Sequence, residues 1–230
     1  MNLPLATRFR ETPRMRITRR GVDGEDLLVV LGWGNKPTHE HVAWLLTRLL
    51  DAGYRVHAVT LPTNGWNFEA QYVAPLDDYL NDNDIDVALS HSTGGLVAER
   101  LSERHALRNV FCSPWWGVRT DGTVDRAVLA AFERLPTARR LYAPDLDAEA
   151  IGDLKSTAEA ATGPDGSFDD GDAVFYTPED RVVDPAEIEE RTPPQNRRSY
   201  DGGHEFFSSS GRDPVLDDVL AALDAGPDAI

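Results

Sequence analysis

A serine lies in the middle of a run of small residues, Ser90-His91-Ser92-Thr93-Gly94-Gly95. An apolar segment, residues 86–89, comes directly before this run, and a helical pattern of apolar residues follows it. A sharp turn from a strand into a helix needs small side chains on both sides of its apex, and Ser90 and Gly94 supply them. Such a turn lifts the Ser92 hydroxyl above the sheet. Serine-rich turns are common, but this context predicts that Ser92 is a nucleophile.

A serine hydroxyl is a weak nucleophile unless a base takes its proton, so a histidine is needed. His204 follows two glycines in Asp201-Gly202-Gly203-His204, and such a loop lets an imidazole reach across the end of a sheet. His91 adjoins Ser92, but neighbouring side chains at such a turn point in different directions. We therefore predict His204 as the base. The other histidines are expected to face solvent before a helix (His39 and His41), to lie within a strand (His57) or to end a helix (His105).

The charged form of a catalytic imidazole needs a carboxylate, which also fixes the orientation of the ring. An apolar stretch at 173–176 predicts a strand, and Asp180 follows that strand closely. Functional residues in open α/β sheets gather at the carboxyl ends of the strands, so Asp180 is the predicted acid. Glu179 and Asp184 are the alternatives, because a single Asp in so acidic a chain is often ordinary solvated surface.

An anionic tetrahedral intermediate is stabilised by preorganised hydrogen-bond donors. The backbone N–H of Thr93 is one candidate donor, and the backbone N–H of Trp33, within Leu31-Gly32-Trp33-Gly34, is the other. The two glycines beside Trp33 are also compatible with an ordinary turn or with part of a dinucleotide-binding fingerprint. That fingerprint requires a third glycine where this chain has Pro37, which argues against a nucleotide cofactor.

The elements that must position these residues alternate between strand and helix. Such alternation predicts an α/β fold with a mostly parallel central sheet flanked by helices, because parallel neighbours need crossover connections. We expect a single domain, residues 1–230, that begins with a loose arm at 1–13 and carries a short helical insertion at about 117–170. The predicted strands are residues 15–17, 27–31, 55–61, 86–89, 109–112 and 173–176, and the clearest helices are 41–50, one ending near Leu80, one after Ser92 and one starting at Asp213-Pro214.

The charge of the chain is extreme for 230 residues, with 23 basic against 39 acidic side chains and a net charge of −16. Such a surface repels phosphate backbones and anionic membranes, so we expect neither as a partner. Lys36 and Lys155 are the only lysines, and this composition is typical of halophilic proteins. No signal peptide or membrane span is evident, which predicts a cytoplasmic protein. Cys112 is the only cysteine and is expected in the core.

The order of these motifs, from Gly32-Trp33-Gly34 through the run around Ser92 to Asp180 and His204, resembles the α/β-hydrolase superfamily over residues 14 to 225. The resemblance implies an α/β-hydrolase fold and a triad of Ser92, Asp180 and His204. It further implies that Trp33 and Thr93 form the oxyanion hole and that residues 117–170 form a lid. The chain departs from the family pattern in two places, where Ser90 replaces the first glycine of the turn and Leu31 replaces a histidine before the oxyanion glycine.

The function favoured by these residues is a carboxylesterase that cleaves a small or medium ester without a cofactor or metal. Trp66, Trp115 and Trp116 lie near the predicted site and are expected to bind substrate, unless they only pack the insertion onto the core. A thioesterase, an amidase or a C–C hydrolase would use the same triad. A dehalogenase or epoxide hydrolase would need an Asp in place of Ser92. The alternative outside the enzymes is a ligand-binding protein of the same fold, and either a monomer or a dimer is compatible with the sequence.

Overall fold

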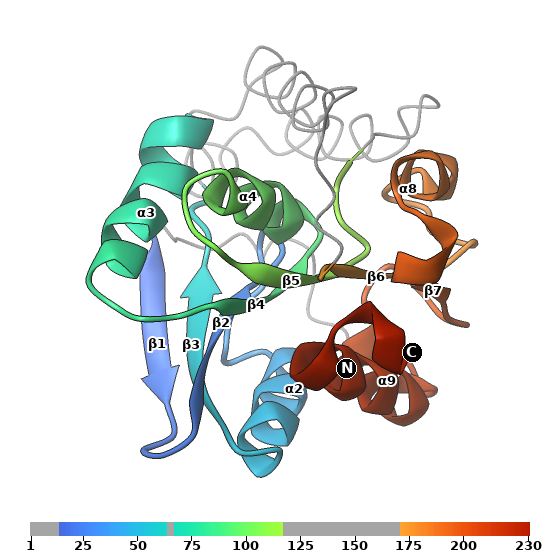
Figure 1. Ribbon diagram of the computed structural model, residues 1–230, viewed down its shortest axis with the longest axis horizontal. Helices are drawn as coiled ribbons and strands as arrows, with labels where there is room; N and C mark the ends of the chain where they lie inside the picture. The colour runs from blue at the N-terminus through green and yellow to red at the C-terminus, as the bar shows by residue number, and fades with distance from the viewer. Residues whose placement is uncertain (1–13, 64–66, 117–170) are drawn as a thin grey trace, which may run out of the picture.

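The computed structural model describes residues 14–63, 67–116 and 171–230, and these form a seven-stranded sheet in the order β1-β3-β2-β4-β5-β6-β7 (Figure 1). β1 is antiparallel to β3, and every other neighbouring pair is parallel. The mostly parallel α/β sheet is therefore confirmed, with its antiparallel strand at one edge. The strands are β1 (Arg16–Arg20), β2 (Glu25–Val30), β3 (Tyr54–Thr60), β4 (Val87–His91), β5 (Arg108–Cys112), β6 (Ala173–Tyr176) and β7 (Arg197–Ser199).

Helices cover both faces of the sheet (Figure 1). The helices α2 (Glu40–Asp51) and α9 (Arg212–Ala225) bury their apolar residues in one core cluster with one face of the strands. On the other face lie α3 (Ala74–Asn81), α4 (Thr93–Ser102) and α8 (Pro185–Arg191). The central strands are apolar on both faces because each face is covered, as expected for a parallel sheet. The described residues also form short 3-10 helices at Pro194–Asn196, Phe206–Ser208 and Pro227–Ala229.

The structure corrects two boundaries. The helix that ends near Leu80 begins with a π-helical segment, Phe68–Val73, before α3. Pro75 lies at the junction, and because proline has no N–H it cannot donate a bond back to the preceding turn. The last helix is capped by Gly211 rather than by Asp213, so Pro214 lies within its first turn, where an N–H is not needed.

Two elements near the predicted site were missed from the sequence. The strand β7 has only three residues, and two of them are arginines, so it shows no apolar pattern. The helix α8 is short and rich in Glu. The expected arm at 1–13 and the insertion at 117–170 lie outside the described residues. Among the helices that the structure describes, none is long and apolar enough to cross a membrane.

Candidate active site

Ser92 lies at the apex of the turn between β4 and α4 in a strained backbone conformation, with φ 54° and ψ −124°. Such a conformation costs a residue other than glycine about 1–3 kcal/mol. The small neighbours are required by close packing: a Cβ on Gly94 would lie 2.2 Å from the Val30 carbonyl oxygen, and one on Gly95 would lie 2.8 Å from Pro114 Cβ. The sharp strand-to-helix turn expected around Ser92 is therefore present.

Asp180 and His204 meet at the carboxyl ends of the parallel strands, after β6 and β7 respectively. His204 Nδ1 lies 2.8 Å from Asp180 Oδ2. The other carboxylate oxygen accepts hydrogen bonds from the backbone N–H groups of Val182, at 2.7 Å, and Val183, at 3.0 Å. Burial alone would raise the pKa of Asp180, but the bonds from His204 and from the two backbone groups outweigh it and hold the pKa below its ordinary value. Asp180 therefore remains a carboxylate beside the ring.

The two alternative acids occupy other places. Glu179 is exposed, and Asp184 caps α8 by accepting a hydrogen bond from the N–H of Ala186 at 3.1 Å. Within the described part of the chain, Ser92 Oγ and His204 Nε2 make no hydrogen bond with each other. Serine–histidine contacts in ligand-free sites often tighten only when substrate binds.

His91 lies beside His204 and contacts its backbone. Its Nε2 is 3.0 Å from the carbonyl oxygen of His204, and the two ring centroids are 4.8 Å apart. Burial, together with the nearby His204 ring, lowers the pKa of His91 to about 4. His91 is therefore neutral and donates its Nε2–H to the backbone of the His204 loop. A Cβ on Gly32 would lie 2.6 Å from His91 Nδ1, so a glycine is required there.

Other side chains also hold the His204 loop by its carbonyl groups. The Thr177 hydroxyl donates to the Gly202 carbonyl at 3.1 Å. The buried Tyr200 hydroxyl lies 3.3 Å from the Gly203 carbonyl oxygen and 3.4 Å from that of His204. A loop that contains two glycines is thereby held by the residues that directly follow β6 and β7, which lowers the entropy cost of orienting the base.

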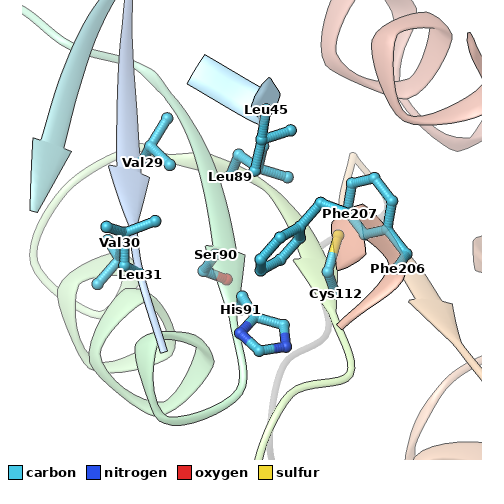
Figure 2. Close-up of a pocket in the computed structure, with 10 residues that line it drawn as sticks. All are labelled: Val29, Val30, Leu31, Leu45, Leu89, Ser90, His91, Cys112, Phe206 and Phe207. Atoms are coloured by element: carbon cyan, nitrogen blue, oxygen red, sulfur yellow. The ribbon is translucent and has the colours of Figure 1, made fainter. Parts of the chain in front are cut away.

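A small cavity of about 10 Å³ lies behind the turn (Figure 2). Its lining is mostly apolar and includes Cys112, Phe206 and Phe207, and Cys112 is buried as expected. Ser90 and His91 also face it, and Ser90 Oγ and His91 Nδ1 are buried without a hydrogen-bond partner among the described residues. A space of this size is large enough for one water molecule, so it is not a substrate pocket.

Of the two expected oxyanion donors, the backbone N–H of Trp33 is engaged by a side chain. The backbone N–H of Trp33 donates to the side-chain hydroxyl of Thr93 at 2.7 Å. The Trp33 indole N–H donates to the Pro62 carbonyl at 2.8 Å, which holds the turn in place. A substrate oxygen that takes the Trp33 N–H must therefore replace the Thr93 hydroxyl as its acceptor.

The predicted substrate-binding tryptophans are buried where the structure describes them. Trp115 is 6% exposed and Trp116 is 2% exposed, and both belong to an apolar cluster with α4 and β6. The Trp116 ring packs on Phe111 with centroids 5.0 Å apart. Among the described residues these rings act as core, which favours the packing interpretation. Trp66 lies outside the described residues.

Sequence reasoning missed a group of polar residues beside the site. His41, expected to face solvent, is instead mostly buried and lies 3.1 Å from Asn35 Oδ1 through its Nε2. Asn35 Nδ2 in turn donates to Glu205 Oε1 at 2.8 Å. Asn35 belongs to the Gly32–Asn35 turn and Glu205 adjoins His204, so closeness to both motifs is the one sequence signal that could have drawn attention to them.

Comparison with known proteins identifies the family of the chain. A family model described as the alpha/beta hydrolase family matches residues 27–226. No curated protein matches the chain in a direct sequence search.

Several solved structures share the fold. An esterase of Pyrococcus furiosus, Pf2001, is 21% identical with a TM-score of 0.57 over 86% of this chain and 80% of that one. A soluble variant of monoglyceride lipase from Saccharomyces cerevisiae is 14% identical with a TM-score of 0.66 over 91% of each chain. A structure reported with carboxylesterases of the thaumarchaeon Nitrososphaera gargenis is 16% identical, with a TM-score of 0.63 over 91% of this chain and 95% of that one. Identities this low show the fold alone.

Proposed function

The chain belongs to the alpha/beta hydrolase family, and on that premise we propose that it is a serine hydrolase that cleaves small or medium carboxylic esters. The observation that carries the proposal is the Asp180–His204 pair at 2.8 Å. It lies at the carboxyl ends of the parallel strands, as does the strained turn of Ser92. The likeness to proteins described as esterases and lipases favours ester cleavage within this family.

In the proposed mechanism Ser92 Oγ attacks the ester carbonyl carbon while His204 Nε2 takes the hydroxyl proton. The imidazolium that forms is stabilised by Asp180, which is kept ionised by its hydrogen bonds from Val182, Val183 and His204. The backbone N–H groups of Trp33 and Thr93 would hold the tetrahedral oxyanion, each such donor contributing about 10²–10³ in rate.

Collapse of the intermediate breaks the ester C–O bond, and His204 gives its proton to the departing alcohol. The acyl group is then bound to Ser92. Water attacks this acyl-enzyme as His204 accepts one of its protons, and release of the acid returns that proton to Ser92. No cofactor is needed to balance these steps, and Asp180 stays ionised throughout.

Labelling with a serine-directed fluorophosphonate tests the proposal, performed in molar salt because of the acidic surface. We expect one adduct, mapped to Ser92 by mass spectrometry, that is lost in Ser92→Ala. Ser102→Ala is the matched control, because Ser102 ends α4 and bonds the Ala98 carbonyl. An unlabelled wild-type protein would contradict the proposal, as would an adduct that survives in Ser92→Ala.

A panel of esters of increasing acyl length, with matched thioesters and amides, then tests the bond that is cleaved. We expect the highest kcat/KM for small or medium esters. A higher kcat/KM for thioesters or amides would replace the ester assignment while leaving the serine mechanism intact.

A further inference from the structure

The two loops that carry the proposed chemistry are joined by a polar bridge of Asn35 and Glu205, residues 170 positions apart in the chain. Asn35 Nδ2 donates to Glu205 Oε1 at 2.8 Å. Asn35 is 3% exposed, and the Glu205 side chain is 13% exposed. A carboxylate placed this far from solvent is costly unless donors compensate it, so the bridge is a specific feature of the fold.

His41 is the third member of this polar group, and the contacts among the three residues set the orientation of the Asn35 amide. Its Nε2 lies 3.1 Å from Asn35 Oδ1 and 3.7 Å from Glu205 Oε2. Because an ionised carboxylate only accepts hydrogen bonds, the Asn35 amide must present its NH₂ to Glu205 and its oxygen to the Nε2–H of His41. The His41 ring stacks on Phe207, with centroids 5.6 Å apart and planes within 14°. Through His41, the bridge therefore packs on the buried ring of Phe207.

Each end of the bridge lies beside a group that the proposed reaction uses. The N–H of Asn35 donates to the Gly32 carbonyl at 2.9 Å and closes the turn that contains Trp33. Glu205 adjoins His204. The Glu205 side chain does not cap the 3-10 helix that begins after it, so it is directed toward Asn35 instead.

We propose that Asn35 and Glu205 are positioning residues that hold the Trp33 donor and the His204 base at the separation that acyl transfer requires. This inference rests on the proposed function. Proton transfer and oxyanion binding must be satisfied together by one substrate, and displacement of reacting groups by about 1 Å can cost about 100-fold in rate. A bridge between the two loops sets that distance directly.

The test compares kcat, KM and unfolding temperature for Asn35→Ala, Glu205→Ala and the double substitution. We expect each single substitution to lower kcat about 10- to 100-fold with KM changed less than about threefold. The double substitution should be no worse than the poorer single one, because both remove the same bridge. Effects that multiply in the double variant would overturn the inference.

An exchange of the two groups separates positioning from folding. Asn35→Asp alone places two carboxylates in contact and should lower kcat. Adding Glu205→Gln restores one donor and one acceptor, and we expect kcat to return to within about fivefold of wild type. Failure of this rescue in a protein that keeps its native circular dichroism would also overturn the inference.

Tyr54→Phe is the matched control, because the Tyr54 hydroxyl donates to Asp224 across the same sequence separation of 170 residues but away from the site. It should lower the unfolding temperature and leave kcat unchanged. If the Asn35 and Glu205 variants also lower only the unfolding temperature and leave kcat unchanged, while Ser92 still reacts with fluorophosphonate, the inference about the bridge is overturned and the proposed function is not. A wild-type protein that does not react would instead overturn the proposed function.

Discussion

Two of the aspartate–histidine pairs that the structure describes lie in opposite settings. His204 meets Asp180 at 2.8 Å on loops after β6 and β7, and the His204 side chain is 16% exposed. His57 meets Asp26 at 2.5 Å on the neighbouring strands β3 and β2, and its side chain is 1% exposed. An aspartate–histidine contact by itself therefore does not identify a catalytic site.

The second nitrogen of each ring makes the difference. His57 Nδ1 lies 2.7 Å from the Tyr79 hydroxyl, and Asp26 is also paired with Arg55. Both ring nitrogens of His57 are thus engaged in the core. Among the described residues, His204 makes no side-chain hydrogen bond beyond the one from Nδ1 to Asp180, and its Nε2 is available for proton transfer. A fully bonded ring stabilises the fold, whereas a ring bonded on one side can do chemistry.

The largest expected effect is the loss of activity on removal of the His204 imidazole. His204→Ala should lower kcat by about 10⁴-fold or more with little change in unfolding temperature, because the proton of Ser92 then has no acceptor. His57→Gln should instead lower the free energy of unfolding by about 1–3 kcal/mol and leave kcat within about threefold of wild type. Ester hydrolysis and thermal unfolding of both variants check this. Comparable losses of kcat in both would remove the distinction between the two pairs.

The next effect is on stability and its dependence on acid. The hydrogen bond from Arg55, opposed by burial and assisted by His57, lowers the pKa of Asp26 to about 2. A depressed carboxyl pKa contributes stability above the ordinary value near 4, and this contribution is lost as pH falls from about 4 to about 2.

Asp26→Asn should therefore lower the free energy of unfolding by about 3 kcal/mol at neutral pH, because a neutral amide with one acceptor oxygen replaces the carboxylate that Arg55 and His57 share. Its stability should also fall less steeply than that of wild type below pH 4. Denaturant unfolding at several pH values measures both. A variant with the same acid slope as wild type would show that Asp26 titrates normally.

His91 is an intermediate case, buried like His57 but in contact with the His204 loop. In the folded protein the pKa of His91 is lowered to about 4 from its ordinary value of 6.5. Between these two pH values the unfolded chain therefore binds a proton at this histidine that the folded protein does not bind. The resulting stability is present above pH 6.5 and declines toward pH 4, by about 2 kcal/mol between pH 7 and pH 5. His91→Gln should flatten this part of the stability–pH curve. A wild-type curve that is already flat there would mean that folding does not lower the pKa of His91.

The smallest expected effect concerns the Thr93 hydroxyl that accepts from the Trp33 N–H. Thr93→Val keeps the branched shape and removes this acceptor, so a substrate oxygen no longer has to displace it. We expect kcat/KM to rise about two- to tenfold, since a net hydrogen bond contributes about 0.5–1.5 kcal/mol. Thr93→Ser is the control that keeps the hydroxyl. A fall in kcat/KM for Thr93→Val would instead make the hydroxyl itself an oxyanion donor.

Much of the fold could be predicted from the sequence because its signals are local. The apolar runs at β2, β3, β4 and β5 record strands buried on both faces, and the small residues around Ser92 record a turn that admits no larger side chain. β7 was not predicted because its own residues show no strand pattern. It is a strand only because it pairs with β6.

The sequence by itself determined the Ser92 turn, the placement of Asp180 and His204 after sheet strands, and the parallel architecture that gathers them, since each follows from neighbouring residues. Only the tertiary structure decided that Asp180 rather than Glu179 or Asp184 meets His204, that Trp115 and Trp116 are buried, and that Glu205 reaches Asn35. These outcomes depend on the directions of loops that follow different strands. Such directions are fixed by packing between segments far apart in the chain, which no local pattern of residues records.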